Sequence, residues 1–127
     1  MQLIRREDLE QVHLPGRVIQ KVVGKDGFSR STRMTVGFAR HSGGSGHEPH
    51  HHAEELVYII SSRDGWVRYG PSPDRLGSPL ALEAGMILHF PELEWHVFNL
   101  GKDGHVDALF FYGQVENIRP EDATKKT

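Results

Sequence analysis

The ten residues from Gly46 to Glu55 (GHEPHHHAEE) contain four histidines and three carboxylates. Imidazole and carboxylate groups together suit divalent zinc, iron, manganese, nickel or copper. Side chains alternate between the two faces of a strand, so His50 and His52 would share one face and His51 would point away. The spacing therefore predicts a transition-metal site. The alternative is a solvated histidine-rich loop, which binds metal only loosely.

Another histidine, His96, lies more than forty residues downstream, after a turn at Pro91 and at the start of an apolar run. A third imidazole from a separate strand could complete a site with the first pair. Three imidazoles and one carboxylate would leave a coordination position open for water, substrate or O2. Open positions are typical of catalytic metal sites rather than structural ones.

Short strand-like runs surround these residues. The runs at 56–60 and 66–69 are β-branched and aromatic, and the segment between them ends in Asp64-Gly65, which predicts a β-hairpin. A short helix is expected at 6–11. Fourteen glycines and seven prolines fit an all-β chain with many turns. Further strands are expected at 17–23, 33–40, 80–83, 86–90, 95–100 and 106–112.

The histidine-rich block resembles the first sequence motif of the cupin superfamily, which contains His-x-His, three or four residues, and then Glu. His50 and His52 match the pair, and Glu55 matches the glutamate with only two residues between. The resemblance implies that Glu55 is the carboxylate ligand, whereas strict alternation would place Glu54 on the histidine face. A bulge after His52 would reconcile Glu55 with that face.

Residues 85–99 are similar to the second cupin motif. Gly85, Pro91 and His96 match it, Leu93 stands where a glycine is usual, and Asn99 comes one residue early. Both motifs in this order imply an all-β fold, the cupin-type double-stranded β-helix or jelly-roll barrel. They imply the following metal ligands: His50, His52, Glu55 and His96.

Tyr58 and Arg68 are the predicted catalytic residues. Tyr58 completes the family's Glu-x-x-Tyr pattern, and the fork of Arg68, or of Arg40, would match a substrate carboxylate. Other side chains could line the core or the pocket: Trp66, Trp95, Phe98, Phe110 and Tyr112. Of the remaining histidines, His89 is expected in the core or the pocket, and three are expected in solvent: His41, His47 and His105.

The composition limits the class of protein. The chain has 127 residues and no cysteine, and its 15 Lys and Arg nearly balance 17 Asp and Glu. These features predict one domain over 1–127, with the barrel at about 17–113, and exclude disulfides and thiolate ligands. Because the net charge is close to zero, the composition does not indicate a charged surface for nucleic acid or membrane, so a small-molecule partner is expected. Without an apolar span or a signal peptide, a cytoplasmic location is expected.

The sequence thus predicts a metal-dependent enzyme that acts on an oxygenated small molecule, and the cupin resemblance favours a dioxygenase-like oxidoreductase. The first alternative is an isomerase or lyase, in which the metal polarises a carbonyl without a redox change. The second alternative is a non-catalytic cupin that binds a small molecule or a sugar, because one fold hosts many functions. A homodimer is expected from the apolar faces of residues 17–23 and 110–112.

Overall fold

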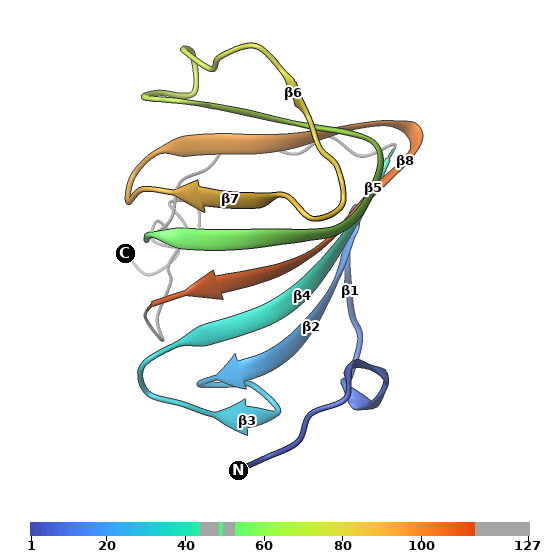
Figure 1. Cartoon of the computed structure of the whole chain (residues 1–127), viewed down its shortest axis with the longest axis vertical. Helices are drawn as coiled ribbons and strands as arrows, with labels where there is room; N and C mark the ends of the chain where they lie inside the picture. The colour runs from blue at the N-terminus through green and yellow to red at the C-terminus, as the bar shows by residue number, and fades with distance from the viewer. Residues whose placement is uncertain (44–48, 50–52, 114–127) are drawn as a thin grey trace.

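Two long antiparallel strands, β5 (Glu55–Gly70) and β8 (Trp95–Tyr112), form the centre of the computed structural model, which describes residues 1–43, 49 and 53–113. One eight-stranded sheet is built around them in the order β1-β2-β4-β8-β5-β6, with β3 on β2 and β7 on β5 (Figure 1). The remaining strands are β1 (Val12–Leu14), β2 (Arg17–Gly24), β3 (Ser29–Arg30), β4 (Thr35–Ser42), β6 (Leu80–Ala81) and β7 (Ile87–Phe90).

Both central strands bend near the middle. The pairing register shifts between Ile59 and Ser61 and again beside Asp64, whose φ of 56° is left-handed. Such bulges bend a strand and increase its twist. The first half of β5 therefore pairs with β7 and the second half with β6, and the sheet curls over itself (Figure 1).

The predicted hairpin at 56–69 is wrong for this reason. Residues 56–60 and 66–69 do not pair with each other, because both pair with β8 in one continuous strand. Gly65 is required at the bend, since a Cβ there would lie 2.9 Å from Ser62 Oγ. The runs at 95–100 and 106–112 are likewise halves of the single strand β8. The strands expected at 17–23, 33–40, 80–83 and 86–90 are confirmed within a few residues, and the helix at 6–11 is one 3-10 turn, η1 (Arg6–Asp8).

The two halves of the curled sheet pack on one apolar core. Val57 from the first half of β5 and Val67 from the second half belong to the same buried cluster. Alternation along each strand directs these side chains inward and their neighbours outward. The other buried members of this cluster are Ile59, Leu82, Phe90, Phe98, Val106 and Ala108. In the described part of the chain, no helix has the length and apolar character needed to cross a bilayer.

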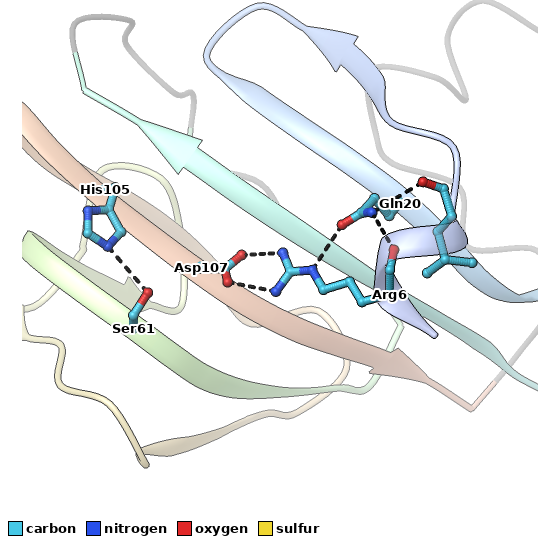
Figure 2. A network of polar contacts seen from close by, with 6 residues as sticks. Arg6, Gln20, Ser61, His105 and Asp107 are labelled. Carbon is cyan, nitrogen blue, oxygen red and sulfur yellow. Dashed lines mark hydrogen bonds and ion pairs between the residues drawn. The ribbon is translucent and has the colours of Figure 1, made fainter. Parts of the chain in front are cut away.

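The N-terminal segment is fastened to the outer face of the sheet by Arg6 (Figure 2). Its guanidinium donates two hydrogen bonds, of 2.6 and 2.7 Å, to the carboxylate of Asp107, and its Nε donates to Gln20. The Gln20 amide in turn donates to the backbone carbonyls of Arg6 and Leu9. The Asp107 hydrogen bond raises the pKa of Arg6 above its ordinary value, so the guanidinium stays charged in any usual buffer. Arg6 also lies over the Phe38 ring, 4.2 Å from its centroid.

The outer face also carries apolar side chains beyond this segment. Leu56 pairs with Phe111 and Tyr58 pairs with Ile87 across neighbouring strands, and all four are more than a third exposed. A contiguous apolar patch of this kind is a candidate interface. The homodimer stays a prediction, and this patch is a candidate surface for the contact between two copies of the chain.

Replacing Asp107 by Asn should lower the free energy of unfolding by about 1–2 kcal/mol, because it removes a bidentate charged pair whose carboxylate is buried while its guanidinium is partly exposed. Asp103→Asn is the matched control, since Asp103 is an exposed carboxylate of the same strand. It should change stability by less than about 0.5 kcal/mol. Urea unfolding of the three proteins measures both differences, and equal stability of the two variants would contradict the fastening role of Arg6.

Candidate functional site

Glu55 and His96 meet inside the barrel. His96 Nε2 lies 3.4 Å from Glu55 Oε1, and both side chains are almost fully buried. Glu55 pairs with Tyr112 at one end of the β5–β8 ladder, whereas His96 pairs with Tyr69 near the other end. Fourteen residues of straight strand would separate these ends by about 45 Å. The bend of the two strands is therefore what brings the imidazole to the carboxylate.

The hydrogen bonding of His96 determines which of its nitrogens faces Glu55. Its Nδ1 lies 3.3 Å from the carbonyl oxygen of Glu94, which can only accept, so Nδ1 carries a proton. In the neutral ring, Nε2 then presents a lone pair toward a carboxylate oxygen. Two buried acceptors in this position call for a cation between them, which can be a proton or a metal ion.

The separation of these two atoms fits two ligands of one metal. Metal bonds of about 2.0–2.2 Å to imidazole nitrogen and carboxylate oxygen place two adjacent ligand atoms about 2.9–3.4 Å apart. A direct charge-assisted hydrogen bond would be shorter, at about 2.7–2.9 Å. A carbonyl that holds the Nδ1 proton is also the usual support of a metal-binding histidine.

Glu54 lies on the opposite side of the strand. Its carboxylate accepts a 2.7 Å hydrogen bond from His89 Nε2, and both side chains are more than half exposed. Glu55 is therefore the carboxylate inside the barrel, in agreement with the register that the cupin resemblance implied. His89 lies on the outer surface, so its expected place in the core or the pocket is wrong.

Aromatic rings exclude water around His96. The Phe90 ring stacks on the imidazole with centroids 4.0 Å apart, and Phe98 lies at 6.5 Å in an edge arrangement. His41 packs against Phe98 with ring centroids 5.4 Å apart and is only partly exposed, so its expected exposure to solvent is wrong. Phe90 was not among the predicted site residues. Its pairing with Glu55 across β5 and β7 could have been found only from the register.

Similar solved structures share this arrangement of strands. The polyketide cyclase RemF from Streptomyces resistomycificus matches with a TM-score of 0.70 and 22% identity, over 94% of this chain and 82% of that chain. A protein from Planctomyces limnophilus gives 0.69 and 17%, over 96% and 94%. A variant of oxalate decarboxylase from Bacillus subtilis gives 0.69 and 19%, over 95% of this chain but only 33% of that chain. No protein-family model and no curated protein matches the sequence.

The chain has the cupin fold. Two residues of the second motif, Gly85 and Leu93, have left-handed backbone conformations in the segment that leads to His96. Gly85 has a φ of 92°, which favours glycine, and Leu93 has a φ of 69° although it carries a side chain. In the turn that contains Leu93, the Glu94 amide donates to the Pro91 carbonyl at 3.2 Å. This chain thus keeps the left-handed turn at a position where its residue is not the glycine usual in the motif.

Two of the predicted metal ligands, His50 and His52, lie outside the described residues, as do His47 and His51. The described residues contain no group of three or more candidate metal ligands. Of the four predicted ligands, the structure therefore describes only Glu55 and His96, and it brings these two together. The four-ligand site stays a prediction.

The structure does not bring Tyr58 and Arg68 to this pair. Tyr58 belongs to the exposed patch on the outer face, because it alternates with the core residue Val57. Arg68 alternates with the core residue Val67, and its guanidinium donates to the Leu76 and Gly77 carbonyls of the following loop. Trp66 and Trp95 also alternate with inward side chains, and Arg40 is exposed opposite Asp107. Three of the predicted aromatic side chains do face the interior: Phe98, Phe110 and Tyr112.

Ser61, His105 and Asp107 lie close together but do not form a catalytic triad. Ser61 Oγ is 3.3 Å from His105 Nε2 (Figure 2). Both oxygens of Asp107 accept hydrogen bonds from Arg6 instead of orienting the imidazole. A nucleophilic serine requires a base oriented by a third group, so this trio is structural.

Replacing Leu93 by Gly should raise the free energy of unfolding by about 0.5–1 kcal/mol. The left-handed conformation costs a residue with a Cβ about 1–2 kcal/mol, and the greater freedom of glycine in the unfolded chain offsets part of this gain. Little burial is lost, because Leu93 is 62% exposed. Leu93→Ala is the control, since it keeps the Cβ and should not stabilise. Thermal and urea unfolding measure the difference, and a less stable glycine variant would contradict the strain at this turn.

Proposed function

We propose that this cupin is a metal-dependent enzyme that acts on an oxygenated small molecule, with Glu55 and His96 as two ligands of its metal. The observation that carries the proposal is the buried pair of facing acceptors, Nε2 and Oε1, at 3.4 Å. Burying two such groups is costly unless a cation joins them. The two remaining ligands of the proposed site are His50 and His52.

When bound, a divalent transition metal would supply Lewis acidity and, if it is redox-active, electrons. The described residues contribute the surroundings. The Glu94 carbonyl holds the Nδ1 proton of His96, which keeps Nε2 available as a ligand. Phe90 and Phe98 exclude water on the imidazole side, and this strengthens electrostatic interactions in the site.

Two reaction types are compatible with this donor set. A dioxygenase-like oxidation is the first candidate, and it requires iron, manganese or copper. An isomerase or lyase reaction is the second candidate, and the names of two similar structures, a decarboxylase and a cyclase, favour it. A non-catalytic binding protein is the alternative to both. The cytoplasmic location and the homodimer stay predictions from the sequence.

Glu55→Gln should weaken metal binding at least tenfold, because it replaces an anionic ligand with a neutral amide. Glu54→Gln is the matched control, since it changes the neighbouring carboxylate on the outer surface and should retain wild-type metal content. Both proteins are reconstituted with Fe(II), Mn(II) or Zn(II), dialysed, and analysed for metal per chain. Circular dichroism confirms that both are folded. Equal loss from the two variants, or no metal in the wild type, would contradict the proposed centre.

The reaction type is tested by comparing iron-loaded and zinc-loaded protein with and without O2. A dioxygenase should turn over enols, diketones or catechol-like compounds only with iron and O2, because zinc has no accessible redox change. An isomerase or lyase should form product with either metal under anaerobic conditions. Oxygen uptake and product analysis separate the two. Saturable binding without turnover under any condition would contradict enzyme function and support a binding protein.

A further inference from the structure

A cleft of about 250 Å³ is lined by residues of β2, β4 and β8, among them Tyr112, the strand partner of Glu55. Its walls are mostly apolar, and the turn at 24–27 forms its rim. The side chains that matter here are Ile19, Lys21, Thr35, Phe110 and Tyr112. All of them belong to neighbouring strands of the same sheet, so the cleft is part of the barrel interior.

Tyr112 connects the cleft to the candidate metal site. It pairs with Glu55 on β5 and with Thr35 on β4, so these three residues form one row across the sheet. The next row inward contains Phe110, Gly37 and Lys21. Residues directly opposite each other on paired strands point to the same face. Lys21 therefore points to the face that carries Phe110 and Tyr112.

The floor of the cleft depends on Gly37. A Cβ at this position would lie 2.5 Å from the Phe110 ring and 2.9 Å from the Gln20 carbonyl oxygen. Only a residue without a side chain allows the Phe110 ring to lie across β4. The ring then provides an apolar surface between Tyr112, with which it makes a tilted contact at 5.4 Å, and the side chain of Lys21.

Lys21 gives this apolar cleft a positive end. In the described part of the chain, no hydrogen bond or ion pair holds its ammonium group. The rim adds Lys25 and Asp26, so two cations face one carboxylate. Arg40 and Arg68, which the sequence suggested for binding a substrate carboxylate, lie outside the barrel. By its register Lys21 is the cation on the inner face at this cleft, and its side chain is exposed to solvent there.

We infer that the cleft binds the substrate of the proposed enzyme, and that this substrate is an organic acid with a short apolar body. Its carboxylate meets the Lys21 ammonium, and its body lies on Phe110 and Ile19. The inference rests on the proposed function for its catalytic meaning, but the binding itself requires no metal.

The dimensions limit the size of this acid. β5 and β2 are separated by two strands in the sheet, so their backbones are about 14 Å apart at a spacing of about 4.8 Å. The lysine and glutamate side chains span part of this distance. A cleft of about 250 Å³ has room for roughly eight waters at about 30 Å³ each. Bonded atoms lie closer together than separate waters, so the same volume holds a molecule of about a dozen non-hydrogen atoms. An arylalkanoic acid has this size, whereas a sugar chain or a peptide does not.

The test uses 3-phenylpropionate and its neutral amide, 3-phenylpropanamide, as probes of equal size. Chemical-shift titration of the metal-free protein should show the acid binding at least tenfold more tightly than the amide. Lys21→Gln should remove this preference while the amide affinity stays unchanged, because the variant loses only the charge. Lys102→Gln is the matched control, an exposed lysine of β8 at the strand bend, and it should keep the wild-type preference.

A second variant, Ile19→Phe, fills the cleft from its inner face and should abolish binding of both probes, which locates them there. Equal binding of acid and amide to the wild type, or an acid preference that survives Lys21→Gln, would overturn the inference. Glu55→Gln should leave the acid preference of the metal-free protein intact although it weakens metal binding. A failed metal site and a failed acid site therefore give different results.

Discussion

The continuous pairing of β5 with β8 is the constraint on which the rest of the structure depends. A straight ladder would place Glu55 and His96 near its opposite ends, far beyond any contact. The bulges beside Ser61 and Asp64 turn both strands back over the core, and Gly65 provides the space for this bend. The same bend lets β7 and β6 pair with different halves of β5. These local irregularities in the backbone thus determine both the curl of the sheet and the geometry of the site.

The interior accepts a polar pair because its surroundings are arranged for it. Phe90 stacks on His96, and the Glu94 carbonyl fixes the ring's tautomer. Such a pair is costly in an apolar core and contributes little to stability unless a cation joins it. A structural role would be served better by two packed apolar side chains, so the retained polarity favours binding chemistry. The outer polar residues behave differently: Arg6 and Asp107 satisfy each other and hold the N-terminal segment.

The departures from the cupin motifs have physical explanations of different kinds. Leu93 adopts the left-handed conformation that the usual glycine would adopt without strain, so the turn before His96 keeps its shape at some cost in stability. The short spacing before the first-motif glutamate still directs Glu55 inward and Glu54 outward. The cation on the inner face at the cleft is Lys21 on β2, on a strand that neither motif includes. In the enzyme that we propose, recognition of the substrate and assembly of the metal site would thus belong to different parts of the sheet.

Local patterns in the sequence determined the all-β class and most strand positions, because alternation and turn residues act over a few positions. The resemblance to the cupin motifs, and not alternation, pointed to Glu55 as the partner of His96. The two motifs were also sufficient to predict the cupin fold. Only the tertiary structure decided that Asp64-Gly65 bends a strand instead of reversing it, because pairing with the distant β8 outweighs the local turn preference. It likewise decided that Tyr58 and Arg68 face outward and that Lys21 faces inward. The direction of a side chain depends on register, and register is set by long-range pairing that no local pattern contains.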